Sequence, residues 1–157
     1  MAKILIVEDD ISLRDVYTAR LQAEGFQIST ASNGEEALAV AVKERPDLII
    51  LDIMMPRISG FDVLDIIRTT PEIAHTRVVM MTALSAPEDR ERGEKLGVDE
   101  YLVKSQVTLE DVVGTIKRVL GGASAAGDTT QPQNSAAPAA TPPTQPAADQ
   151  PPTPPAQ

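Results

Sequence analysis

Acidic residues that could hold a cation occur at two places in this 157-residue sequence, each directly after a short apolar run. Glu8–Asp10 follows the run Ile4–Val7. Asp52 follows the run Leu48–Leu51. Carboxylates brought within a few ångströms of one another repel, and the repulsion raises their pKa values unless a cation lies between them. A hard divalent ion relieves it, and Mg²⁺ suits a site with few protein ligands and room for water.

Two further polar residues end apolar runs in the same way. Thr82 follows Val78–Met81, and Lys104 follows Tyr101–Val103. A lysine ammonium is a compact cation that can pair with a carboxylate and then with a phosphoryl oxygen. A threonine hydroxyl can bond another oxygen of the same group. With the acidic residues, these side chains predict a phosphoryl-transfer site in which a carboxylate is the candidate nucleophile.

The apolar runs are continuous rather than alternating, which is typical of strands buried on both faces of a parallel sheet. We expect strands at Ile4–Val7, Leu48–Leu51 and Val78–Met81, and two weaker ones over Phe26–Thr30 and Tyr101–Val103. Five strands alternating with five helices predict an α/β fold with a doubly wound parallel sheet. The order 2-1-3-4-5 is one of two common choices, and the spacing alone does not select it. Because ligands bind beyond the carboxyl ends of such strands, we expect the polar residues to meet at one edge.

Helix ends are also visible in the sequence. Asp10 is of a type that caps helix N-termini, and we expect it to cap the first helix. Asn33 followed by Glu36, and Ser85 followed by Glu88, match the capping-box pattern. The last helical pattern begins at Leu109, and the two glycines at positions 121 and 122 predict its end.

Composition excludes several classes of protein. The chain has no cysteine, which excludes disulfides, thiolate metal sites and a cysteine nucleophile. Its formal net charge of −9 argues against direct binding of nucleic acid, which needs Lys and Arg against phosphates. No apolar run is long enough for a signal peptide or a membrane span, so we expect a cytoplasmic protein without a membrane partner.

The composition changes sharply near residue 120. Residues 121–157 contain nine prolines, no Lys or Arg, and no apolar residue larger than Ala. Such a segment cannot bury enough surface to offset the entropy lost on ordering. We therefore predict a folded domain over residues 2–120 and a disordered, Pro/Ala/Thr/Gln-rich C-terminal tail over residues 121–157.

The motif residues together resemble the receiver domain of two-component response regulators. The resemblance rests on Val7–Asp10, on Asp-x-x-Met-Pro-x-x-x-Gly from Asp52 to Gly60, on Met81–Ala83 and on Tyr101–Lys104. It covers nearly all of residues 2–120. It implies a flavodoxin-like fold with strand order 2-1-3-4-5 and five helices, and a phosphorylation switch of the stand-alone type rather than an enzyme.

The resemblance also implies roles for single residues. Asp52 would accept a phosphoryl group from a histidine of a sensor kinase or phosphotransfer protein. Asp9 and Asp52 would ligate Mg²⁺ directly, with the backbone oxygen of Met54, and Glu8 would act mainly through water.

Further roles concern the phosphoryl oxygens and the output. The backbone amides of Met54 and Ala83, with Thr82 and Lys104, would hold these oxygens, and Thr82 and Tyr101 would form the switch. The output face is usually the fourth helix, fifth strand and fifth helix, here about residues 87–120. It would contact an unknown output protein in a monomer or in a phosphorylation-dependent dimer. No DNA-binding output domain is visible in the sequence.

Two features depart from the usual pattern or modify it. Ser105 follows Lys104 where the family usually has a proline joined by a cis bond, which leaves the reach of Lys104 open. Met54 and Leu84 lie two positions after Asp52 and Thr82 and are apolar. Neither can hold a water for attack on a phosphoaspartate, so we expect slow hydrolysis.

Two other functions remain alternatives. A phosphorylation-independent adaptor would keep the fold as a docking surface. An aspartyl-phosphate phosphatase of the haloacid-dehalogenase type would carry its nucleophile in an Asp-x-Asp arrangement after the first strand. That place reads Glu8-Asp9-Asp10-Ile11 here, which disfavours the phosphatase.

Overall fold

The computed structural model describes residues 2–125, in which five strands alternate with five α-helices. In chain order the elements are β1 (Lys3–Val7), α1 (Ile11–Ala23), β2 (Gln27–Ala31), α2 (Gly34–Glu44), β3 (Leu48–Asp52), α3 (Gly60–Thr69), β4 (Arg77–Thr82), α4 (Pro87–Lys95), β5 (Glu100–Val103), the short 3₁₀ helix η1 (Lys104–Gln106) and α5 (Leu109–Ala125). No helix within this range is both long and apolar enough to cross a membrane.

The five strands form one parallel sheet in the order β2-β1-β3-β4-β5, which confirms the predicted doubly wound topology. The predicted strands lie within one or two residues of the observed ones. The starts of β1, β2, β4 and β5 are each shifted by one residue, and β2 begins at Gln27 rather than Phe26.

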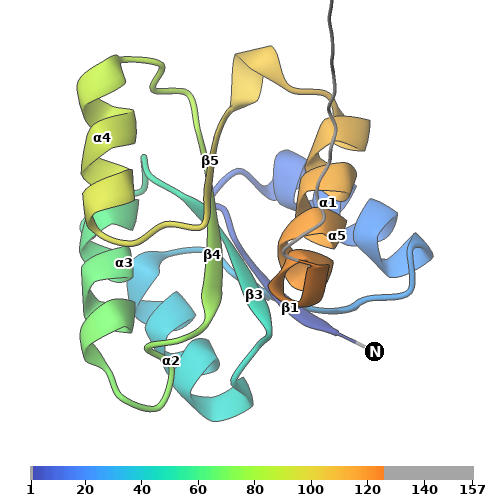
Figure 1. Ribbon diagram of the computed structural model, residues 1–157, viewed down its shortest axis with the longest axis horizontal. Coiled ribbons are helices and arrows are strands. Elements are labelled where there is room, and N and C mark those ends of the chain that lie inside the picture. Colours follow the sequence, from blue (N-terminus) through green and yellow to red (C-terminus); the bar gives the residue numbers. More distant parts are fainter. Residues whose placement is uncertain (1, 126–157) are drawn as a thin grey trace, which may run out of the picture. The chain divides into compact units, whose positions relative to one another are not determined.

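The core lies on both faces of the sheet. Successive residues of a strand point to opposite faces, so a strand buried on both sides is apolar throughout. In β1, Leu5 and Val7 belong to one apolar cluster, and Ile4 and Ile6 belong to the other. Helices α2, α3 and α4 cover the first face, and α1 and α5 cover the second (Figure 1).

Local capping confirms two predicted helix starts and corrects a third. The Asp10 side chain accepts a hydrogen bond from the Leu13 amide (3.1 Å), and the Asn33 side chain accepts one from the Glu36 amide (2.8 Å). The predicted cap at Ser85 is wrong, because α4 begins one residue later, after Ala86, without a side-chain cap. Its first residue is a proline, which needs no partner for a missing N–H group and already has a helical φ.

The predicted end of the last helix is also wrong. α5 continues through residues 121 and 122 to Ala125. A glycine ends a helix most effectively when it takes a left-handed conformation. Among the described residues, the glycines with a left-handed conformation are Gly25 and Gly97, neither of which lies in α5. The predicted disordered tail falls outside the described residues from position 126 onward, so the division into domain and tail stays a prediction.

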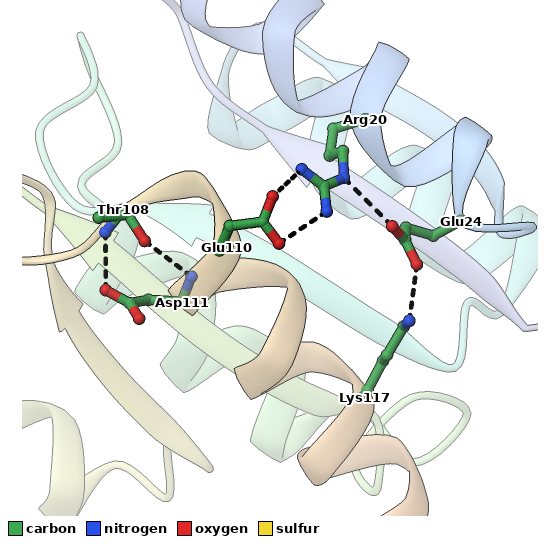
Figure 2. A network of polar contacts seen from close by, with 6 residues as sticks. All are labelled: Arg20, Glu24, Thr108, Glu110, Asp111 and Lys117. Atoms are coloured by element: carbon green, nitrogen blue, oxygen red, sulfur yellow. Dashed lines mark hydrogen bonds and ion pairs between the residues drawn. The ribbon is translucent and has the colours of Figure 1, made fainter.

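A polar network of Arg20, Glu24, Glu110 and Lys117, called the α1–α5 network below, joins these two helices at the surface (Figure 2). The Arg20 guanidinium donates to both oxygens of Glu110, at 2.8 Å for the Nη2–Oε1 pair, and to Glu24 at 3.2 Å. Lys117 donates to the other oxygen of Glu24 at 2.6 Å. Hydrogen bonds from Lys117 and Arg20, together with their positive charges, hold the pKa of Glu24 below its ordinary value. Arg20 does the same for Glu110.

Candidate functional site

The predicted site residues lie at the carboxyl ends of four strands: Asp52 and Thr82 end β3 and β4, and Glu8 and Lys104 directly follow β1 and β5. In a parallel sheet these ends share one edge, and the register places them level with one another. Val7 pairs with Leu51, and Thr82 pairs with Val103. The loops that follow each strand therefore start side by side, as the sequence predicts.

Three carboxylates gather at this edge. Glu8, Asp9 and Asp52 each offer an oxygen, and these oxygens lie within 4.8 Å of one another. Glu8 and Asp52 are only 3% and 4% exposed, whereas Asp9 is exposed. The cluster is thus open to solvent on the Asp9 side. A donor set of carboxylate oxygens with one open side fits a hard divalent cation such as Mg²⁺.

Lys104 reaches the carboxylate cluster from the end of β5. Its Nζ lies 2.7 Å from Glu8 Oε2 and 3.4 Å from Asp52 Oδ2. The Lys104–Ser105 peptide is trans and opens the turn η1. A trans bond with serine in place of proline therefore still directs the ammonium toward Asp52.

Burial and neighbouring charges shift the pKa values of this cluster in opposite directions. Burial raises the pKa of Glu8 and outweighs the hydrogen bond from Lys104, and the nearby charge of Asp52 raises it further. Burial by itself lowers the pKa of Lys104, but Glu8 and Asp52 together raise it above its ordinary value. The cluster holds three carboxylates, of which Glu8 and Asp52 pair with the Lys104 ammonium, so it keeps an excess of negative charge.

The loop after β3 shows why the motif from Asp52 to Gly60 needs its spacing. The Met54 amide donates to Asp52 Oδ1 (3.2 Å), and the Gly60 amide donates to the Ile53 carbonyl oxygen (2.9 Å). A Cβ on Gly60 would lie 2.4 Å from the Asp52 carbonyl oxygen, so only glycine allows this return of the chain. Met54 itself is 57% exposed beside the carboxylates.

Thr82 and Tyr101 are joined through the backbone of one residue. Thr82 is fully buried, and its Oγ1 accepts a hydrogen bond from the Leu84 amide at 3.0 Å. The Tyr101 hydroxyl donates to the carbonyl oxygen of the same Leu84 at 3.1 Å. Tyr101 is 3% exposed, so its ring lies inside the protein rather than half in water. Ala83 is exposed and directly follows the carboxyl end of β4.

The structure adds one residue near the site, Tyr17, to which the sequence assigns no role. Tyr17 of α1 is 7% exposed, and the charges of Lys104, Glu8 and Asp52 all act on its pKa. The available signal was a tyrosine on the buried stripe of an amphipathic helix, where an aliphatic residue serves equally well for packing. The periodicity of the helix accounts for a buried ring at this position, so the sequence gives no reason to assign Tyr17 a role in the site.

Comparison with known proteins identifies the class of the protein. Residues 4–117 match the response regulator receiver domain, and the chain belongs to this family. It is 42% identical over 102 residues to the probable transcriptional regulator ycf27 of Cyanophora paradoxa, covering 65% of this chain and 41% of that protein. It is 34% identical over 120 residues to the DNA-binding dual master transcriptional regulator RpaA of Synechocystis, covering 76% and 49%. The chain thus matches about half or less of these relatives.

Solved structures agree with this assignment. The chemotaxis protein CheY4 of Vibrio cholerae has a TM-score of 0.71 and 38% identity, covering 76% of this chain and 98% of that one. The signal receiver domain of a histidine kinase from Syntrophus aciditrophicus has a TM-score of 0.72 and 30% identity, covering 83% and 98%. Both matches span nearly the whole of the compared chain.

Proposed function

We propose that Asp52 accepts a phosphoryl group from a phosphohistidine of a partner kinase or phosphotransfer protein, and that the modified chain changes its protein contacts. The observation that carries this proposal is the setting of Asp52. Its carboxylate is nearly buried, lies in a cluster of three carboxylates and faces the Lys104 ammonium at 3.4 Å. A structural ion pair would not need two further acidic groups beside it.

The transfer is a displacement at phosphorus. One Asp52 oxygen forms the new O–P bond while the N–P bond to the histidine breaks, and the imidazole nitrogen keeps the electron pair of that bond. Phosphoryl transfer depends mainly on positioning and on neutralising charge, so the residues around Asp52 do most of the work. Lys104 lies close enough to Asp52 to pair with a phosphoryl oxygen, the Met54 amide donates to Asp52, and Ala83 directly follows β4 at the same edge.

Asp9 and Asp52, with the Met54 carbonyl oxygen and Glu8 through water, would hold Mg²⁺, which supplies positive charge against the phosphoryl oxygens. The carboxylate cluster supports this assignment because its oxygens lie within 4.8 Å of one another. Glu8 has a second task, since its Oε2 is the nearest partner of Lys104 at 2.7 Å. The ammonium is thereby kept beside Asp52 before the transfer.

The response to phosphorylation would begin at Thr82. A phosphoryl group carries a charge near −2 and attracts the threonine hydroxyl, which now accepts a hydrogen bond from Leu84. Because Leu84 also holds the Tyr101 hydroxyl, a movement of its backbone changes the setting of Tyr101. Tyr101 lies beneath α4, so the change would reach the proposed output face over about residues 87–120.

The partner classes follow from the same chemistry. We infer a histidine kinase or phosphotransfer protein as donor, and an output protein rather than DNA as target. The relatives ycf27 and RpaA are named as transcriptional regulators, but this chain matches less than half of their length. A cytoplasmic location, a non-enzymatic role and the oligomeric state stay predictions.

Intact-mass measurement tests the proposal. The full chain is incubated with Mg²⁺ and a small-molecule phosphodonor, with Asp52→Asn as the matched control. We expect the mass of one phosphoryl group on the wild type only, and only with Mg²⁺. No gain in folded, Mg²⁺-binding protein would contradict the proposal and favour the adaptor. Steady release of phosphate from phosphomonoesters would favour the phosphatase.

A further inference from the structure

Arg14 joins helix α1 to the loop that carries two carboxylates of the cluster. Its Nη1 donates a hydrogen bond of 3.0 Å to the carbonyl oxygen of Glu8, and this contact is partly buried. The Arg14 amide donates to the Asp10 carbonyl oxygen at 2.9 Å, so the residue lies one turn into the helix. Side chains on a helix point back toward its N-terminus, which brings the Arg14 guanidinium to the loop between β1 and α1.

The oxygen that Arg14 binds belongs to the peptide group between Glu8 and Asp9. Successive side chains of an extended chain point to opposite faces of a sheet, so in a continued strand these two carboxylates would diverge. Instead β1 ends at Val7 and the chain bends at Asp9. Oxygens of Glu8, Asp9 and Asp52 then lie within 4.8 Å of one another. The orientation of this one peptide group therefore decides whether both carboxylates reach Asp52.

The neighbouring groups of the loop are held by other contacts. The Glu8 amide donates to the Ala31 carbonyl oxygen of β2 at 3.1 Å, and the Asp10 amide donates to Glu8 Oε1 at 3.2 Å. Among the residues that the structure describes, Arg14 is the partner of the Glu8 carbonyl oxygen. Glu8 is only 3% exposed, so this oxygen has little access to water as a substitute partner.

We propose that Arg14 is a positioning residue for the metal site, because it fixes the peptide group that aims Glu8 and Asp9 at Asp52. This inference rests on the proposed function, in which Mg²⁺ binds the carboxylate cluster. Arg14 acts through the backbone, since its hydrogen bond goes to a carbonyl oxygen rather than to a carboxylate. Its positive charge by itself opposes the binding of a second cation. Positioning and charge therefore predict opposite effects when Arg14 is replaced.

Arg14→Met removes the guanidinium and keeps an unbranched side chain. If charge alone mattered, the variant would bind Mg²⁺ more tightly than the wild type. We expect about tenfold weaker binding instead, the usual effect of losing a residue that orients metal ligands. Arg14→Lys keeps the charge and an N–H donor, and should recover most of the affinity. Isothermal titration calorimetry with Mg²⁺ alone measures all three proteins.

Arg20→Met is the matched control on the same helix. It also removes a cation from α1, together with the hydrogen bonds to Glu24 and Glu110. We expect a lower melting temperature and an Mg²⁺ affinity equal to that of the wild type or slightly higher. Arg14→Met lowers the melting temperature as well, because a nearly buried carbonyl oxygen loses its partner. The contrast in Mg²⁺ affinity separates positioning of the site from support of the helix.

A second measurement needs no metal. The Asp9 amide belongs to the same peptide group as the Glu8 carbonyl oxygen, so its ¹H–¹⁵N NMR signal reports the orientation of that group. In metal-free protein we expect this signal to shift in Arg14→Met. It should stay near the wild-type position in Arg14→Lys and in Arg20→Met.

The outcomes distinguish this inference from the proposed function. An Mg²⁺ affinity of Arg14→Met equal to or above that of the wild type overturns the inference and leaves the role of Asp52 intact. An equal loss in Arg14→Lys or in Arg20→Met also overturns it, because the hydrogen bond to the loop would then not be the cause. A wild type that binds Mg²⁺ but gains no phosphoryl group from a small-molecule phosphodonor contradicts the proposed function itself.

Discussion

Glu8 at the carboxyl edge of the sheet and Glu110 in the α1–α5 network both bind a cationic side chain, yet their pKa values shift in opposite directions. Glu110 is well exposed and shares a guanidinium with Glu24, and its pKa is lowered by the hydrogen bonds from Arg20. Glu8 is 3% exposed, and burial raises its pKa despite the hydrogen bond from Lys104.

The opposite pKa shifts reflect a different balance of charge in the two regions. In the α1–α5 network every carboxylate has an adequate cation, so ionisation favours the folded state. At the sheet edge Glu8 and Asp52 share the Lys104 ammonium beside a third carboxylate, and burial raises the pKa of Glu8, so ionisation of Glu8 opposes folding. A ligand that binds only the folded state returns this free energy as stability. The first region stabilises the fold, and the second has the donor set that could hold a cation.

Replacing one carboxylate in each region should give the largest difference, which is in Mg²⁺ affinity. Asp9→Asn should weaken Mg²⁺ binding by more than about tenfold, because it removes a proposed direct ligand from the open side of the cluster. Glu110→Gln should leave Mg²⁺ binding unchanged. Isothermal titration calorimetry measures both. Equal affinities in the two variants would remove the distinction between the regions.

The next prediction concerns Met54, the apolar neighbour of the carboxylates, and the lifetime of the phosphorylated chain. Met54 is 57% exposed and cannot hold a water molecule by hydrogen bonding. Met54→Asn should shorten the lifetime of the phosphorylated chain by about tenfold, the effect of one well-placed hydrogen bond on the barrier. The decay of phosphorylated protein, followed by intact mass, gives this lifetime. An unchanged lifetime would show that access of water is controlled elsewhere.

The two regions should also respond oppositely to acid. A raised folded-state pKa means that Glu8 adds stability once protonated, and this gain is lost as pH rises through that pKa above 4.5. Lowered pKa values mean that Glu24 and Glu110 add stability above 4.5 and lose it as pH falls through their folded-state values.

The metal-free protein should therefore become more stable as pH falls from neutrality toward 4.5 and less stable below it. Thermal unfolding across this range measures the maximum. Glu8→Gln should remove the rise, and saturating Mg²⁺ should remove it as well because the metal favours the ionised carboxylate. A steady fall from neutral pH downward would contradict the assigned direction for Glu8.

The smallest expected effect concerns the α1–α5 network alone. Glu110→Gln should lower the melting temperature slightly, and the difference should vanish in high salt because exposed ion pairs are screened. Thermal unfolding at low and high salt checks this. A loss that persists in high salt would mean that Glu110 supports α5 through packing rather than charge.

The fold and most of the candidate site could be predicted from the sequence. Continuous apolar runs indicated the parallel strands, and the carboxyl ends of parallel strands must share an edge. The sequence therefore predicts that Asp52, Thr82 and Lys104 lie at one edge of the sheet. The departure at Ser105 did not disturb this arrangement, because Lys104 is directed by the end of β5 and the following turn.

Other features could not be predicted because they depend on tertiary contacts. The sequence does not show that Glu8 binds Lys104 directly, since that contact joins residues 96 positions apart. The cap predicted at Ser85 failed because the following proline can start a helix without a cap. Tyr17 was missed because helix periodicity accounts for any apolar ring at its position.

The claim that the site holds excess negative charge for a cation is tested most directly by thermal unfolding of wild type and Asp52→Asn, each with and without Mg²⁺. Without Mg²⁺, the variant should be more stable than the wild type by about 1 kcal/mol, because one of three mutually repelling carboxylates is gone. Mg²⁺ should stabilise the wild type strongly and the variant weakly. A variant less stable than the wild type without Mg²⁺, or an equal gain from Mg²⁺ in both, would contradict the account.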